Sequence, residues 1–196
     1  MSGDGKKMGR KEMTAVLDEI GRRMEARGLI AEFAVFGGSA IALTFDFRDS
    51  TNDIDFMPIS GNMDALSEVT REIGAERGFV DGWFNDAVEI FASDNPEYRL
   101  VGEFPWDNPG IRVFAASPQY ILAMKVMSMR SSMVASDFKD VWHLVDEIGV
   151  TTADEVIGIV EGFYPEKTVP RRNELILRDL FDEKDAKRPF NAMTGF

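Results

Sequence analysis

Residues 33–39 read Phe-Ala-Val-Phe-Gly-Gly-Ser, and residues 53–57 read Asp-Ile-Asp-Phe-Met. The first stretch is a short apolar run that ends in two glycines and a serine, which is typical of a buried strand entering a tight turn. The second stretch alternates acidic and apolar side chains, which is typical of a strand with one buried face. The two stretches together predict a strand, a glycine turn, a short helix over residues 39–47 and a second strand.

The acidic pair in the second stretch is the first candidate for chemistry. Asp53 and Asp55 flank one apolar residue, so alternation along a strand puts both carboxylates on the same face of the sheet. Two carboxylates this close repel each other unless a cation lies between them. Such oxygen ligands suit Mg²⁺, which commonly takes one or two carboxylates together with substrate phosphates. Exposed loops also contain many Asp-x-Asp pairs, so the spacing alone is also compatible with two solvated charges that bind nothing.

The glycine turn is the second candidate. Glycines after a buried strand let backbone N–H groups approach an anion, and the N-terminus of the following helix favours negative charge. Ser39 can add a hydroxyl donor. The alternative is a tight turn that needs a positive φ angle and binds nothing. Together with Asp53 and Asp55, the turn predicts a phosphate cradle beside a metal site.

The rest of the chain divides into a mixed part and a helical part. Amphipathic spacing predicts helices over residues 11–26 and 63–76, and short apolar runs between turn residues predict strands over 87–91, 98–104 and 111–115. After Ser117-Pro118 the pattern is helical, with four helices expected over residues 118–129, around 138–149, over 152–163 and over 171–181. The predicted fold is therefore α/β (α+β), a mixed sheet flanked by helices. We predict a disordered or tag-like lead-in over 1–10, an α/β core over 11–116 and a helical part over 117–196.

Composition limits the function classes. The chain has no cysteine, which excludes disulfides and thiolate chemistry and fits a cytoplasmic protein. Its sequence shows no secretory signal and no apolar stretch long enough to span a bilayer, so we expect no membrane association. The net charge of −12 disfavours extensive binding to a nucleic-acid backbone. Basic residues near the C-terminus form either a local patch or a solvated helix face.

Two separated motifs resemble a known family. The segment Phe36-Gly37-Gly38-Ser39, followed by Asp53-Ile54-Asp55, resembles the signature of the nucleotidyltransferase superfamily with the DNA polymerase β-type fold. The same region is similar to AbiEii-like branches, which supply toxins of toxin–antitoxin and phage-defence systems. Their second signature is a helix with Ala-Met-Lys, then an arginine and an acidic pair. The residues that carry the likeness are Gly37 to Ala40, Arg48, Thr51, Asp53 to Phe56, Ala123-Met124-Lys125, Arg130, Asp137 and Asp140.

The resemblance covers roughly residues 30–149 and implies an enzyme, a nucleotidyltransferase. Such an enzyme moves a nucleotidyl group from an NTP to an acceptor, which is RNA, protein or a small molecule, with Mg²⁺ as cofactor. As a toxin it would have a cognate antitoxin as partner. The implied roles are nucleotide binding by Gly37, Gly38, Ser39 and Lys125, metal binding by Asp53 and Asp55, and catalysis by Asp53, Asp55, Lys125, Asp137 and Asp140.

The chain departs from the family pattern in two places. Ser136 stands where the acidic-pair motif has an arginine, and no residue clearly matches a third metal carboxylate. Glu89 is the candidate by position, and Asp86 is a second. Lys125 is alternatively an exposed helix lysine, and the later aspartates are alternatively helix caps. Two other functions stay open, a catalytically inactive nucleotidyltransferase-like binding protein and an antibiotic-modifying nucleotidyltransferase.

Overall fold

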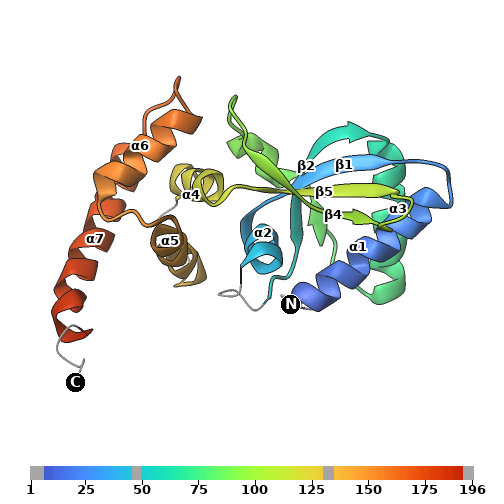
Figure 1. Ribbon diagram of the computed structural model, residues 1–196, viewed down its shortest axis with the longest axis horizontal. Helices are drawn as coiled ribbons and strands as arrows, with labels where there is room; N and C mark the ends of the chain where they lie inside the picture. The colour runs from blue at the N-terminus through green and yellow to red at the C-terminus, as the bar shows by residue number, and fades with distance from the viewer. Residues whose placement is uncertain (1–6, 46–49, 130–134, 192–196) are drawn as a thin grey trace. The chain divides into compact units, whose positions relative to one another are not determined.

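The computed structural model describes residues 7–45, 50–129 and 135–191. The chain divides into two compact units, one of residues 1–92 and 97–117 and the other of residues 93–96 and 118–196. Figure 1 shows a sheet in the first unit and helices in the second. The sheet has five strands. The predicted α+β class is confirmed.

The sheet of the first unit is mixed, with the strand order β3-β2-β1-β5-β4. β1 pairs with β2 in antiparallel and with β5 in parallel orientation, β4 pairs with β5 in antiparallel orientation, and β2 pairs with β3 in parallel orientation. Because β1 and β5 are parallel, their C-terminal ends meet at one edge of the sheet. The strands are β1 (Ala31–Val35), β2 (Ile54–Gly61), β3 (Phe84–Asn85), β4 (Tyr98–Phe104) and β5 (Ile111–Ala116).

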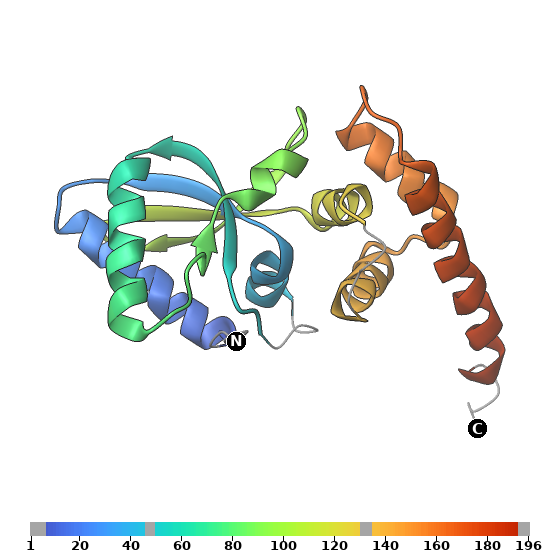
Figure 2. The same ribbon diagram turned by 180° about the vertical axis from the view of Figure 1, so that it is seen from behind.

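One face of this sheet carries the core of the unit. Phe33, Ile54 and Val113 of three neighbouring strands are fully buried. Helices α1 (Arg10–Glu25) and α3 (Met63–Arg77) contact each other, α1 also contacts β4 and β5, and Figure 2 shows α3 crossing the strands. A Cβ at Gly21 of α1 would overlap the backbone carbonyl of Phe104, so this glycine permits the close approach of α1 to β4.

The opposite face of the sheet is polar and partly exposed. Glu32 accepts a hydrogen bond from the Ser60 hydroxyl at 2.6 Å and one from Arg112 at 2.7 Å. Arg112 also donates to Glu103 at 2.7 Å. The pKa of Glu32 is held below its ordinary value, first by the Ser60 hydroxyl and then by the Arg112 guanidinium, although desolvation opposes the shift. This face therefore carries charge where the other carries the core.

Two expectations about strands are wrong. Residues 87–91 form the 3₁₀ helix η1 (Ala87–Phe91), because Asn85 accepts the N–H of Ala87 and the run satisfies its backbone internally. The strand predicted over residues 53–57 does not end before Pro58 but continues through it to Gly61. The pairing of β1 with β2 shifts register opposite Pro58, and at such an irregularity the missing N–H of proline is tolerated.

The described end of the expected lead-in belongs to the fold. Met8 is 1% exposed and exchanges two backbone hydrogen bonds with Thr51, at 2.7 and 3.0 Å. The helix that follows begins at Arg10, whose guanidinium donates to the carbonyl of Ala42 at 3.2 Å. Residues 1–6 of the expected lead-in lie outside the described residues.

The second unit contains the four predicted helices. Tyr120 stacks on Phe163 with ring centroids 4.9 Å apart, and the buried Asn173 amide donates to the carbonyl of Val126 at 2.8 Å. Within the described residues, no helix is both long and apolar enough to cross a membrane. The helices are α4 (Pro118–Met127), α5 (Ala135–Ile148), α6 (Ala153–Phe163) and α7 (Arg171–Asn191).

Candidate functional site

Gly37, Gly38 and Ser39 form the first turn of helix α2 (Gly37–Thr44), which follows β1 with only Phe36 between them. The helix predicted over residues 39–47 therefore begins two residues earlier and ends at Thr44. Gly37 has a φ angle of +53°, in the left-handed region that favours glycine. Among the residues that the structure describes, no side chain caps the N-terminus of α2. The first N–H groups of a helix have no partner within the helix, so they are available to an anion here. Gly37 and Gly38 are both partly exposed.

Asp55 lies directly against this turn. Its backbone carbonyl accepts the N–H of Phe36 at 2.9 Å, which joins the start of β2 to the residue before the turn. A Cβ placed on Gly37 would lie 2.8 Å from Asp55 Oδ2. Only a residue without a side chain therefore leaves room for this carboxylate. The structure brings Gly37 and Asp55 together.

Asp53 precedes β2 and is held by a different contact. Its Oδ1 accepts a hydrogen bond from the Thr51 hydroxyl at 3.1 Å. Thr51 is buried and is itself fixed by its two backbone hydrogen bonds to Met8. Asp53 and Asp55 are both half-buried, so neither is a fully solvated loop charge. Both carboxylates retain contact with solvent while their backbone is anchored.

Ser39 does not have the geometry expected of a phosphate ligand. Its side chain is fully buried, and its hydroxyl donates to the carbonyl of Phe36 at 2.7 Å. A serine hydroxyl has one proton, which is used here to close the turn. The contribution of Ser39 is therefore to the shape of the turn, and the donors that face outward are backbone groups.

Asn85 is the residue that sequence reasoning missed. It is the register partner of Asp55 across β2 and β3. Its Nδ2 donates to Asp55 Oδ1 at 3.2 Å and to the carbonyl of Gly82 at 3.0 Å, while its Oδ1 accepts the N–H of Ala87 at 3.1 Å. In the sequence, Asn85 is a single amide directly after the apolar pair Trp83-Phe84. Nothing in that pattern predicts a contact with Asp55.

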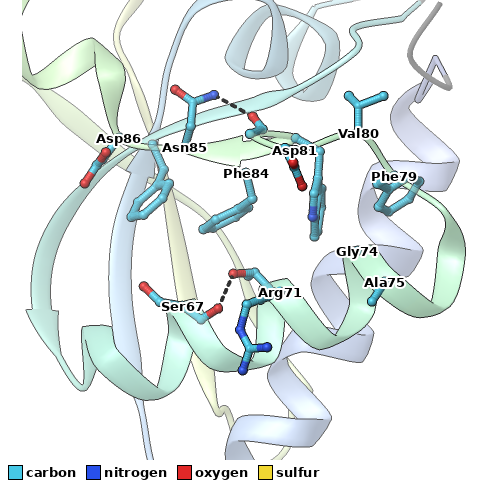
Figure 3. A pocket seen from close by; sticks show the side chains of 14 residues that line it. Ser67, Arg71, Gly74, Ala75, Phe79, Val80, Asp81, Phe84, Asn85 and Asp86 are labelled. Carbon is cyan, nitrogen blue, oxygen red and sulfur yellow. Dashed lines mark hydrogen bonds between the residues drawn. The ribbon is translucent and has the colours of Figure 1, made fainter. Parts of the chain in front are cut away.

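A cavity of about 330 Å³ adjoins this amide, between α3 and the segment that contains β3. Figure 3 shows Asn85 at its edge, with the amide bonded to Gly82. Aromatic rings of Phe56 and Phe84, 4.3 Å apart and stacked, form part of its wall. Polar lining comes from Ser67, Thr70, Arg71, Asp81 and Asp86.

The two candidates for a third metal carboxylate lie on η1 and at its start. Glu89 is exposed on the 3₁₀ helix, and Asp86 is the exposed residue that precedes that helix. Neither is the register partner of Asp55, a place that Asn85 occupies. Across the described residues, no group of three or more carboxylate or histidine side chains is arranged to hold a metal ion.

The site residues predicted in the second unit are partly brought together. Lys125 of α4 and Asp140 of α5 form an ion pair of 3.0 Å, with side chains 13% and 6% exposed. Lys125 is thus not an exposed helix lysine. Asp137 belongs to α5, but its side chain lies outside the described part of the structure, as do Arg48 and Arg130.

A comparison of the sequence with protein-family models finds no match, and a comparison with curated proteins finds none either.

Proposed function

We propose that this protein is a Mg²⁺-dependent nucleotidyltransferase, which moves a nucleotidyl group from an NTP to an acceptor. The observation that carries the proposal is the contact between Asp55 and the turn at Gly37. A carboxylate oxygen of Asp55 and the uncapped N-terminus of α2 are adjacent there. They lie so close together that a Cβ on Gly37 would overlap the oxygen. A metal-bound phosphate group needs this combination of a cation ligand and backbone donors.

The residues present fit a magnesium ion. Asp53 and Asp55 would hold it through their side-chain oxygens, and the ion would neutralise charge on the bound triphosphate. The protein itself positions the two carboxylates and the phosphates. Hydrogen bonds from Thr51 and Asn85 hold one oxygen of each carboxylate, and the α2 N-terminus presents N–H groups to the phosphates. Positioning and charge compensation account for most of the catalysis in phosphoryl and nucleotidyl transfer.

By its resemblance to the family motif, Lys125 is the cation that we propose for the triphosphate. In the proposal, Lys125 compensates negative charge on the leaving pyrophosphate. Its ammonium is held by Asp140, and both side chains are largely buried. A lysine fixed in this way loses less conformational entropy when it meets an anion than a free surface lysine does. Asp140 then acts on Lys125 and needs no contact with the nucleotide.

The proposal is tested by transfer of label from α-labelled NTP, with Mg²⁺, to cellular RNA, to the protein itself or to a cationic small molecule. Asp55→Ala should abolish labelling, because it removes one of the two proposed metal ligands and leaves only Asp53. Lys125→Ala should lower the rate by about 10²- to 10³-fold, the usual effect of losing one placed electrostatic contact. Lys139→Ala is the matched control, since Lys139 is exposed on the same helix as Asp140.

Each outcome has a defined meaning. The labelled acceptor identifies the substrate class, and a toxin role with a cognate antitoxin requires that acceptor to be a cellular macromolecule. Labelling that survives Asp55→Ala unchanged would refute the proposed site. Mg²⁺-dependent NTP binding without labelling of any acceptor would favour a catalytically inactive binding protein.

A further inference from the structure

The amide of Asn85 occupies a defined position beside Asp55. Both residues lie at register-paired positions of β2 and β3, so their side chains project on the same face of the sheet. The neighbouring residues Phe56 and Phe84 project to the other face, where their rings stack 4.3 Å apart. That aromatic contact fixes the pairing of the two strands, and the pairing fixes the amide opposite the carboxylate.

The orientation of the amide is set at both ends. Its oxygen accepts the N–H of Ala87, and its nitrogen donates to the carbonyl of Gly82 and to Asp55. A flipped amide would place oxygen against two acceptors and lose all three bonds. The N–H group therefore faces Asp55 Oδ1, while Oδ2 of the same carboxylate lies at the Gly37 turn.

We propose that Asn85 is a positioning residue, which holds Asp55 Oδ1 so that Oδ2 stays at the Gly37 turn for a divalent cation. This inference rests on the proposed function, because Asp55 is taken as the metal ligand. An amide at this place donates a hydrogen bond without adding charge. A carboxylate in its place would repel Asp55 in the absence of metal.

The first test measures metal affinity with Mn²⁺ alone, by electron paramagnetic resonance of the free ion and with the full chain. Asn85→Ala should weaken Mn²⁺ binding by about 10- to 100-fold, the usual effect of removing a partner of a metal ligand. Asn108→Ala is the matched control, because Asn108 donates a similar bond of 2.8 Å to Glu25 elsewhere in the same unit. In an Asp55→Ala background, Asn85→Ala should have no further effect.

The second test observes the contact directly and does not depend on the fold of an Asn85 variant. In proton–nitrogen correlation spectra, the side-chain amide signals of Asn85 should move on Asp55→Ala and on titration of the wild-type chain with Mg²⁺. Those of Asn108 should not move.

The failures are distinguishable. The positioning role would be overturned if a folded Asn85→Ala variant bound Mn²⁺ with wild-type affinity. It would also be overturned if the Asn85 amide signals did not shift on Asp55→Ala. Either result would leave the proposed function standing. Absence of Mn²⁺ binding by the wild-type chain would overturn the metal site and, with it, the role of Asn85 towards a cation.

Discussion

Substitution of Gly37 by alanine perturbs the centre of the proposed site in two separable ways. Gly37 has a φ angle of +53°, so any side chain there carries the strain of the left-handed conformation. That strain costs about 1–2 kcal/mol of stability. The added Cβ would also lie 2.8 Å from Asp55 Oδ2, closer than real Cβ atoms approach other heavy atoms.

The second effect is the one that concerns function. Ordinary contact begins at 3.4 Å, so the carboxylate oxygen must retreat by the difference from 2.8 Å, about 0.6 Å. Misplacement of a reacting group by about 1 Å can cost about 10²-fold in rate. We therefore expect Gly37→Ala to weaken Mg²⁺-dependent NTP binding by about 10- to 100-fold.

A matched variant separates strain from displacement. Gly28 has a φ angle of +68°, but a Cβ there would meet no atom within 4 Å. Gly28→Ala should lose a similar amount of stability in urea unfolding and keep full NTP affinity. Titration calorimetry with a non-hydrolysable NTP and Mg²⁺ measures the affinity of both variants. Equal affinities of folded Gly37→Ala and Gly28→Ala would refute the reasoning that Asp55 acts at the turn.

Other substitutions test the remaining contacts, each by urea unfolding. Lys125→Met should destabilise by about 3 kcal/mol, because it removes the ammonium that pairs with the buried Asp140 carboxylate, and adding Asp140→Leu should recover most of the loss. Glu32 has a lowered pKa, so its ionised carboxylate contributes fully to the free energy of unfolding above pH 4.5, its ordinary pKa. That contribution is lost as the pH falls through the lowered pKa of the folded state. Glu32→Gln should therefore destabilise at pH 7, and its effect should shrink as the pH falls through the lowered pKa of Glu32. Gly21→Ala should destabilise by about 1–3 kcal/mol through overlap with β4. Gly158→Ala, with open space around its helix position, should stabilise by up to about 1 kcal/mol.

The parts of the fold that could be predicted from sequence are those set by local patterns. The strand before Gly37, the glycine turn and the alternation around Ile54 follow from hydrophobic spacing and from the backbone freedom of glycine. The helices after Ser117-Pro118 follow in the same way. Local alternation also predicts Asp53 and Asp55 on one face, although β2 begins only at Ile54.

The parts that could not be predicted depend on pairing between distant segments. Asn85 meets Asp55 only because β3 pairs in parallel with β2 after the intervening helix. Residues 87–91 are apolar enough for a strand, but no strand is paired with them, and an asparagine side chain starts a helical turn instead. Likewise, the partnership of Lys125 with Asp140 arises from the packing of α4 against α5.

The most direct test of the central claim is the affinity for a non-hydrolysable NTP, measured by calorimetry with and without Mg²⁺ on the wild-type chain and on Asp53→Asn with Asp55→Asn. Asp81→Asn serves as the control, since Asp81 is an exposed acid of the same unit. The account predicts that Mg²⁺ tightens binding markedly in the wild-type and control chains and has no effect in the double variant. Equal affinity with and without Mg²⁺ in the wild-type chain, or a Mg²⁺ effect that survives loss of both carboxylates, would contradict it.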